Sequence, residues 1–396
     1  MALPAFAFLL VPSTAKAQTP PSTPADFKTL ASQAAAASEQ DRIEDAIALY
    51  TRALVLRPQW AEGWWSLGTL RYDQSRYAPA AQDFEKVTSL SPRNGTAHAM
   101  LGLCQFELGQ DEAALKSLLE GQKLGVQKDQ QLRGVVLYHL GVLELRARKF
   151  GDARVTLGQL VKEGVKTKEA MAALGMAVLM VRPADAPAEG TARAQVIERA
   201  GEAETFLELK DFGRAQQSYA DLTAAFPDFP NLHFARGRFL LEVHDTEEAL
   251  TEFHRELKGN PVDQKSLLEI AAVLYQTDSA EGIKYAKQAV QLDPQRPFGH
   301  YLLGLLYVDV KNDSGAISEL EIAKRSYASV PEVYFALGNA YARAGRKAEA
   351  ARARATFTRL KAQRKKRSDD TVYDGHPRAL TLEELGAEPD KNPPEL

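Results

Sequence analysis

The chain has 396 residues, a formal net charge of −3 and a single cysteine, Cys104. A charge so close to neutral gives no general attraction to nucleic acid, and one cysteine excludes an intramolecular disulfide framework. The fold must therefore be held by burial of apolar side chains, and we expect Cys104, in an apolar context, to be buried with them.

The first residues have the pattern of an export leader. An apolar run over 2–11 is followed by Ala15-Lys16-Ala17, which matches the small-residue cleavage site of a signal peptide. The run is too short to span a bilayer, and no lysine or arginine precedes it. We expect a signal peptide over 1–17, cleaved after Ala17, and a periplasmic or secreted protein. The alternative is a cytoplasmic protein with an apolar extension. The proline-rich stretch 18–25 is expected to be a flexible spacer.

A small residue recurs along the chain at a spacing of 34 positions. The pairs with this spacing are Gly68 and Gly102, Gly141 and Gly175, and Gly304 and Gly338, and the same phase is occupied by Ala34, Ala203, Gly237 and Ala271. A period of this length is typical of arrays built from small repeated units. The spacing therefore predicts that most of the chain is an array of such repeated units.

Each unit contains two apolar stripes with helical spacing. Around Gly68, the residues Trp64, Leu67 and Tyr72 share one helical face, and Ala80 with Phe84 begins a second stripe. Small residues at fixed phases let two antiparallel helices approach closely, while large ones fill the space beside them. Neither helix buries its stripe alone, so the units must stack.

This pattern resembles the tetratricopeptide repeat (TPR) family, with W-x2-L-G in the first helix, A-x3-F in the second and a proline at the end. The matching segments are Ala46-Tyr50-Ala53-Pro58, Trp64-Leu67-Gly68-Ala80-Phe84-Pro92, Ala215-Tyr219-Pro227, Ala249-Phe253-Pro261, Leu303-Gly304-Tyr307-Ala316 and Leu337-Gly338-Tyr341-Ala350. The resemblance implies an all-α, right-handed α-solenoid of about nine helix–turn–helix repeats over residues 26–364.

The spacing changes slightly between Ala271 and Gly304, which is one position short, and more strongly at two other places. The step from Gly102 to Gly141 is longer than the regular spacing, and the surplus fits the polar stretch 127–131. After Gly175 no second helix follows at the expected distance, and 182–190 is rich in proline, alanine and glycine. We therefore expect an N-terminal array over 26–167, an orphan helix and loop over 168–193, and a C-terminal array over 194–364. The interruption is either a half-repeat lost and absorbed by packing, or a hinge or docking loop.

The C-terminal region differs in composition from the repeats. Residues 365–396 are charged and contain several prolines, which predicts disorder. A basic cluster over 359–367 spans the end of the last expected helix and the start of this tail. It is expected either to complete the last helix at the open end of the array or to make weak contact with an anionic surface.

No catalytic signature is found in the sequence. It contains no G-x-S-x-G elbow, P-loop, H-E-x-x-H or C-x-x-C motif, and its seven histidines are dispersed. We therefore predict no enzyme activity, no cofactor, and no catalytic or metal-ligating residues.

The resemblance places the working surface on a concave groove lined by the first helix of each repeat. Carried onto this chain, the groove residues are Trp65, Tyr72, Phe106, Tyr138, Arg146, Phe234, Arg238, Tyr275, Tyr301, Phe335, Asn339 and Arg343. An aromatic-rich groove with scattered arginines suits an apolar peptide or an amphipathic helix. We expect a non-catalytic scaffold or adaptor for other proteins. The alternative is an accessory protein that binds an envelope polymer or a carbohydrate.

Overall fold

The computed structural model describes residues 26–126 and 130–365, and every regular element within them is helical. The chain divides into two compact units, residues 1–127 and 128–396. The division falls in the polar stretch where the repeat spacing lengthens between Gly102 and Gly141. The expected leader (1–17), the spacer (18–25) and the tail from residue 366 onward lie outside the described residues.

The first unit consists of three helix pairs. Its helices are α1 (Phe27–Glu39), α2 (Ile43–Leu56), α3 (Ala61–Asp73), α4 (Tyr77–Leu90), α5 (Gly95–Glu107) and α6 (Asp111–Leu124). Each odd-numbered helix packs against the helix that follows it, and each pair packs against the next. This arrangement is the stacking that the repeated apolar stripes predict.

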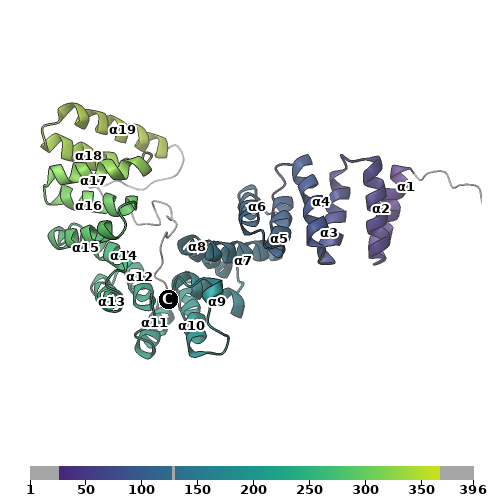
Figure 1. The fold of residues 1–396 in the computed structure, drawn as a ribbon, viewed down its shortest axis with the longest axis horizontal. Helices are drawn as coiled ribbons and strands as arrows, with labels where there is room; N and C mark the ends of the chain where they lie inside the picture. The colour runs from purple at the N-terminus through teal and green to yellow at the C-terminus, as the bar shows by residue number, and fades with distance from the viewer. Residues whose placement is uncertain (1–25, 127–129, 366–396) are drawn as a thin grey trace, which may run out of the picture. The chain divides into compact units, whose positions relative to one another are not determined.

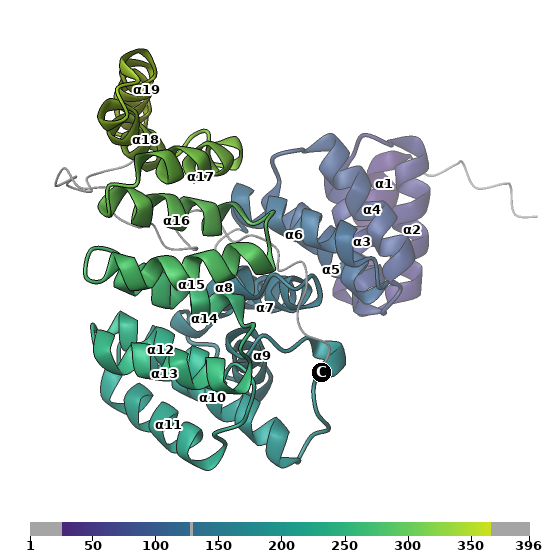
Figure 2. The same cartoon turned by 60° about the vertical axis from the view of Figure 1, so that its left-hand side comes forward.

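The second unit contains five further pairs and an irregular group of three helices. The pairs are α7 (Gln130–Arg146) with α8 (Phe150–Lys162), α12 (Leu232–Glu242) with α13 (Thr246–Gly259), α14 (Gln264–Leu274) with α15 (Ser279–Leu292), α16 (Pro297–Asp309) with α17 (Asp313–Ser326), and α18 (Pro331–Arg343) with α19 (Lys347–Lys365). Figures 1 and 2 show α14 to α19 stacked in chain order. The described residues thus form an all-α solenoid, and the expected number of about nine repeats is confirmed.

The recurring small residue makes room for one large side chain of the second helix. A Cβ atom added to Gly68 would lie 3.1 Å from the ring of Phe84, and one added to Gly237 would lie 2.5 Å from the ring of Phe253. In both cases the large residue follows the glycine by 16 positions. Gly102, Gly141 and Gly304 meet a leucine with the same offset, namely Leu118, Leu157 and Leu320. The recurring small residue therefore marks the place where a large side chain of the second helix, here called the knob residue, packs onto the backbone of the first helix.

The turn inside each pair contains a residue in the left-handed region. The residues with positive φ in these turns are Asp41, Ser75, Gly109, Arg148, Lys210, His244, Gln276, Lys311 and Gly345. Only two of the nine are glycine, although a positive φ is unfavourable for residues that have a Cβ atom. The recurrence of this conformation in every turn makes it part of the repeat.

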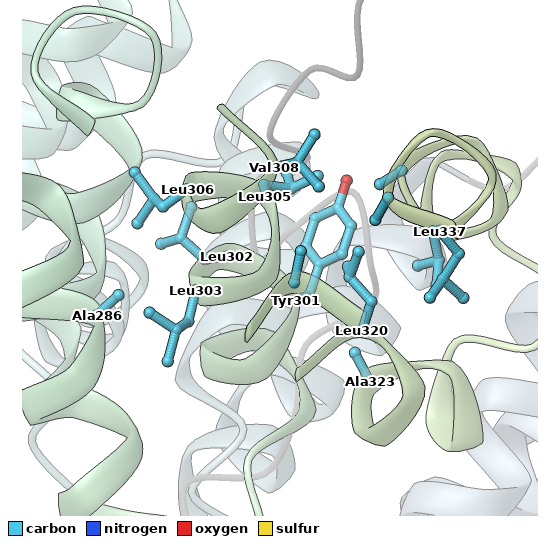
Figure 3. Packing of buried hydrophobic residues seen from close by; sticks show 14 of the residues in the cluster. Ala286, Tyr301, Leu302, Leu303, Leu305, Leu306, Val308, Leu320, Ala323 and Leu337 are labelled. Carbon is cyan, nitrogen blue, oxygen red and sulfur yellow. The ribbon is translucent and has the colours of Figure 1, made fainter. Parts of the chain in front are cut away.

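The second unit has an extensive apolar core between α14 and α19. Tyr301 of α16 is completely buried, and it lies among Leu305, Val308 and Leu320 (Figure 3). Its ring also packs at 6.2 Å from that of Tyr327. Aromatic side chains of first helices can therefore belong to the core instead of the surface.

The interruption is built from α9 (Lys168–Val178), α10 (Ala192–Glu208) and α11 (Phe212–Ala225). Helix α9 packs against both α8 and α10, and α10 also packs against α11. The expectation of an orphan helix over 168–193 is therefore corrected. The second helix is present but begins later, after a turn that includes the short 3-10 helix Pro183–Asp185 (η1). Helix α10 therefore serves two repeats. It packs against α9 as the second helix of one repeat and against α11 as the first helix of the next.

The contact between α9 and α10 is closer than the contacts in the regular pairs. A Cβ atom on Gly175 would lie 1.9 Å from the carbonyl oxygen of Ile197, and one on Gly201 would lie 1.8 Å from that of Met171. No side chain fits at either position, so the two backbones touch. Both glycines are required for α9 to be covered by α10.

The loop between α9 and α10 is held by charged contacts. Lys168 Nζ lies 2.6 Å from Glu189 Oε1, and Arg182 pairs with Asp185. These side chains are largely exposed, so each pair contributes little stability. Among residues 26–126 and 130–365, no helix is long and apolar enough to cross a membrane.

Candidate functional site

The side chains expected in the groove fall into three groups by exposure. Phe234 and Tyr301 are buried, and Arg146 and Arg343 are exposed. The half-buried members are Trp65, Tyr72, Phe106, Tyr138, Arg238, Tyr275, Phe335 and Asn339. The half-buried group presents part of each side chain to solvent, so these residues are the accessible aromatic and polar members of the expected groove together with the two exposed arginines.

Two of the expected groove residues are core residues. Phe234 is 4% exposed and packs at 5.8 Å from Phe253, the knob residue of its own pair. Tyr301 is 0% exposed within the core of α14 to α19. Their assignment to an exposed groove surface is corrected, because side chains of neighbouring helices cover both rings. The sequence pattern alone does not separate such rings from half-buried ones.

In the first unit, Trp65 lines an open cavity. The indole packs edge-on against Phe84 at 5.5 Å, so one part of it is anchored in the core. Another part lines a cavity of about 740 Å³ together with Pro92, Asn94 and Leu124. Asn94 is occupied as the N-cap of α5, where its side chain accepts from the backbone N–H of Ala97 at 3.0 Å. The cavity therefore combines an aromatic wall with a rigid helix start.

Three half-buried tyrosines of the expected groove, Tyr72, Tyr138 and Tyr275, are neutral phenols. Burial raises the pKa of Tyr72 to about 12, and it raises that of Tyr275 to about 12 as well. Burial also raises the pKa of Tyr138. Each ring thus offers an apolar face together with a hydroxyl that can donate a hydrogen bond.

The residues expected at the end of the array have structural contacts. Phe335 packs against Phe357 of α19 with ring centroids 5.3 Å apart. Arg343 Nε lies 2.7 Å from Asp313 Oδ1, and Arg343 Nη2 donates to the carbonyl of Val308 at 2.9 Å. Arg343 therefore joins α18 to the preceding pair, and it is braced by structural contacts although its side chain is exposed.

A small cavity lies at the interruption, where α8, α9, α10 and α12 meet. Its volume is about 50 Å³, and it is lined by apolar and charged residues, including Phe150, Arg154, Met180, Glu204, Leu207, Phe234, Arg238, Phe239 and Glu242. Of the expected groove residues, it brings together Phe234 and Arg238. It is far below the about 300–1,000 Å³ typical of small-molecule sites. A cavity of this size is suited to a single side chain.

One wall of this junction cavity is a buried carboxylate held from two sides. Glu204 is 3% exposed. It accepts a hydrogen bond from Arg154 Nη1 at 2.7 Å and another from the hydroxyl of Tyr219 at 2.9 Å. Arg154 belongs to α8 and Tyr219 to α11, so Glu204 of α10 joins the preceding pair to the last helix of the irregular group. A buried charge of this kind is tolerated only with such partners.

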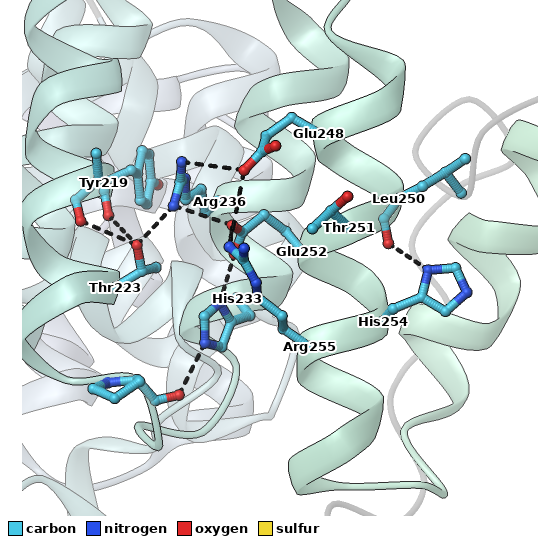
Figure 4. Close-up of polar contacts among 12 residues, drawn as sticks. Tyr219, Thr223, His233, Arg236, Glu248, Leu250, Thr251, Glu252, His254 and Arg255 are labelled. Carbon is cyan, nitrogen blue, oxygen red and sulfur yellow. Dashed lines mark hydrogen bonds and ion pairs between the residues drawn. The ribbon is translucent and has the colours of Figure 1, made fainter.

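A second polar cluster lies between α11, α12 and α13 (Figure 4). His233 Nδ1 lies 2.5 Å from Glu252 Oε2, and Arg236 Nη1 lies 3.1 Å from Glu252 Oε1. Arg255 also pairs with Glu252. Burial alone would raise the pKa of Glu252, but the hydrogen bond from His233 and the charges of Arg236 and Arg255 lower it. The cluster ties the two helices of one pair together.

A contact that the sequence analysis missed recurs at the start of several first helices. The imidazole of His233 faces the carbonyl of Pro227 at 2.9 Å, and that of His300 faces the carbonyl of Pro294 at 2.9 Å. The indole N–H of Trp64 donates to the carbonyl of Pro58 at 2.8 Å. In every case the proline lies six positions earlier. That spacing is visible in the sequence, and it would have identified these histidines as structural.

The described residues present no arrangement for metal binding. Within 26–126 and 130–365, no group of three or more His, Cys, Asp or Glu side chains could hold a metal ion. Cys104 is completely buried, and burial raises its pKa to about 12. Its thiol is therefore a core group, as expected from the sequence.

Comparisons with solved structures show similarity to helical repeat proteins. MamA from Desulfovibrio magneticus is 18% identical over 44% of this chain and 98% of its own, with a TM-score of 0.39. Yeast Tom70 is 15% identical over 85% of this chain and 69% of its own, with a TM-score of 0.34. A tetratricopeptide repeat protein from Parabacteroides merdae is 15% identical over 71% of this chain and 98% of its own, with a TM-score of 0.32. A comparison with curated protein sequences gives no significant match.

A family model supplies the stronger finding. The tetratricopeptide repeat model matches residues 32–87, 66–124 and 201–263. The first two segments cover helices of the first unit, and the third begins inside α10 and runs through α13. These are segments where a small residue meets a large one 16 positions later. Residues 32–124 and 201–263 therefore match the tetratricopeptide repeat family.

Proposed function

We propose that this chain is a non-catalytic scaffold that binds a peptide or helix of a protein partner across the exposed surfaces of its first helices. The observation that carries the proposal is the half-buried state of Trp65 beside an open cavity of about 740 Å³. Tetratricopeptide repeat proteins are in general scaffolds without catalysis, which supports the same conclusion.

The chemistry of the half-buried side chains favours a protein ligand. An aromatic ring anchored at one edge loses little side-chain entropy when a partner covers the rest of it. Trp65, Tyr138 and Tyr275 each combine apolar area with a polar edge, as is common at the centre of protein interfaces. Such rings occur in both units, so each unit offers its own contact surface.

The junction cavity adds a specific anchoring point to this proposal. Its apolar floor includes Phe234 and Phe239, and its charged wall includes Arg154 and Glu204. We propose that it receives one side chain of the partner, while the surrounding first helices bind the backbone and flanking residues. A sugar ring or a larger small molecule would not fit a cavity of about 50 Å³.

Alanine substitutions test the assignment. Trp65→Ala and Tyr138→Ala should weaken partner capture in cross-linking from the native cell envelope, because they remove contact area. The matched control is Val55→Ala, since Val55 is 75% exposed on the second helix α2. Equal loss in all three variants, or no loss in any, would reject the first helices as the binding surface.

The alternative ligand is an envelope polymer or carbohydrate, because sugar rings also stack on aromatic side chains. Purified protein and isolated cell-wall polymer distinguish the two. Cosedimentation that needs no other protein and is lost in Trp65→Ala would replace the protein partner with the polymer.

We further propose that the chain is exported, on the basis of the apolar run and the Ala15-Lys16-Ala17 sequence. Mass spectrometry of protein from its native source tests this. A mature N-terminus at Gln18 is expected, and an intact Met1 would contradict export.

A further inference from the structure

The last helix, α19, is strongly basic compared with the rest of the array. Over residues 347–365 it contains seven lysines and arginines and one acidic residue, Glu349. Arg352, Arg354 and Arg359 are exposed. Glu349 is paired with Arg346, which precedes the helix. The helix therefore has a net charge of +6, seven minus one, concentrated on one end of the second unit.

The exposed arginines of α19 differ from basic residues elsewhere in the second unit. Arg154 and Arg343 each bind a carboxylate of another helix. Within the described part of the chain, Arg352, Arg354 and Arg359 make no ion pair. Like charges on one helix repel each other when nothing neutralises them, so this surface favours an acidic partner.

Arg354 also occupies a position that is apolar in the regular pairs. It has the same offset from Gly338 that the knob residues have from their own glycines, and a Cβ atom on Gly338 would lie 3.2 Å from Arg354 Cγ. The matching positions in other pairs are the buried Phe84, Phe253 and Leu320. A large apolar knob is thus replaced here by a side chain whose stem packs and whose charged end reaches solvent. The last pair is built to present charge.

The segment that follows α19 has the complementary composition. Residues 368–396 contain eight aspartates and glutamates and two lysines and arginines, a net charge of −6. At about 3.3 Å per residue this segment could extend roughly 95 Å, while α19 is about 28 Å long at 1.5 Å per residue. The tether is therefore long enough to return along the whole helix, and it holds the carboxylates at high effective concentration.

We propose that the acidic segment 368–396 docks on the basic face of α19 and shields it from other anionic surfaces. The contact is electrostatic, so it weakens as salt shortens the screening length from about 30 Å at 0.01 M to about 3 Å at 1 M. Three leucines, Leu380, Leu382 and Leu385, also give the segment apolar area to lay against the half-buried Phe357. This surface is separate from the one proposed for the partner.

Zero-length carbodiimide cross-linking of the full chain tests the docking. At low salt, Lys347 at the start of α19 should join Glu383, Glu384 or Glu388, and 1 M salt should remove these products. Arg352→Glu combined with Arg359→Glu should reduce them at least fivefold. The matched control is Arg52→Glu with Lys86→Glu, which makes the same charge change at exposed sites of the first unit and should leave the yield unchanged.

Vesicles containing phosphatidylserine distinguish the acidic segment from a lipid surface. If the segment covers α19, a variant with Glu383→Gln, Glu384→Gln and Glu388→Gln should bind these vesicles at least fivefold more tightly than the unaltered chain. Equal binding of both proteins would overturn the proposal. So would cross-links from the acidic segment that are spread over Lys265, Lys287 and α19 without preference.

Discussion

The regular pair α3–α4 and the irregular group α9–α11 solve the same packing problem differently. In the regular pair, Gly68 accommodates the ring of Phe84, so an apolar knob fills the space between the helices. In the irregular group, Gly175 and Gly201 bring two backbones together, and backbone atoms take the place of the knob. The charged pair Arg154 and Glu204 then closes the side of the group.

The difference shows how the packing changes when two neighbouring repeats share one helix and the array has one helix fewer. When one helix is shared between two neighbours, the space normally filled by a large side chain is filled by backbone contact on one side. A small cavity with a buried carboxylate remains on the other. The irregular group should therefore tolerate no added side chain at Gly175 or Gly201, and its stability should also depend on its charged pair.

Within the irregular group, the largest effect is expected from adding one methyl group at the closest backbone contact. Gly201→Ala would place a Cβ atom 1.8 Å from the carbonyl oxygen of Met171, so the helices must separate. We expect a loss of about 3 kcal/mol in the free energy of unfolding. The same substitution at Gly213 of α11 meets nothing within 4 Å and should stabilise the protein by about 0.5–1 kcal/mol, because alanine favours a helix. Urea denaturation measures both, and equal effects would refute the close backbone contact.

Removing the cation that neutralises Glu204 should have the next largest effect on the free energy of unfolding. Arg154→Met leaves a carboxylate that is 3% exposed with only the Tyr219 hydroxyl, which should cost about 3 kcal/mol. The double variant Arg154→Met with Glu204→Gln should recover part of this loss. As a control, Arg42→Met breaks an exposed pair with Asp45 and should cost less than about 1 kcal/mol. A single variant no more harmful than this control would show that Glu204 does not need its partner.

A pH effect is expected in the pair α7–α8. Burial raises the pKa of Glu144 to about 7 from an ordinary value of 4.5, although Thr156 donates to it. One of its carboxylate oxygens has no hydrogen-bond partner among the described residues. The folded state thus retains the proton longer than the unfolded state, so stability falls as pH rises from 4.5 to about 7.

The variant Glu144→Gln should remove that loss. We expect it to stabilise the protein by on the order of 2 kcal/mol at pH 8 and to change little at pH 4.5. Thermal unfolding at the two pH values measures the difference. The exposed control Glu112→Gln should show no such dependence, and an equal gain at both pH values would contradict the assigned cause.

The smallest effect on stability is expected at the proposed contact surface. Trp65→Ala removes a half-buried ring and should cost about 1–2 kcal/mol, whereas Phe84→Ala removes a buried one and should cost about 3–4 kcal/mol. Differential scanning calorimetry would show both values. A loss for Trp65 as large as that for Phe84 would place the indole in the core.

Much of the fold could be predicted from the sequence because the packing of each helix pair requires a small residue at a fixed position. The spacing of Gly68, Gly102 and their equivalents identified each pair, since a small residue is needed wherever a knob packs. The lengthened step before Gly141 coincides with the division between the two units. The leader, the spacer and the last residues of the tail remain predictions.

The site was less predictable, because position in the repeat does not determine exposure. Trp65 and Tyr301 have the same phase, but one is half-buried and the other is completely buried. The step from Ala271 to Gly304 is one position short of the regular spacing, and the packing around Tyr301 depends on the helices on both sides of it. The left-handed turn residues were also missed, because positions such as Ser75 and Lys311 do not contain glycine.

The central claim is that a protein partner binds on the first helices, and site-specific photo-cross-linking in the native cell tests it most directly. A photoreactive amino acid would replace Trp65 of α3 or Tyr275 after α14, and as a control Val55 of α2 or Val155 of α8, both of which are exposed on second helices. We predict a discrete adduct to one partner from the Trp65 and Tyr275 positions, and none from the controls. Adducts from the control positions alone, or from all four positions equally, would contradict the claim.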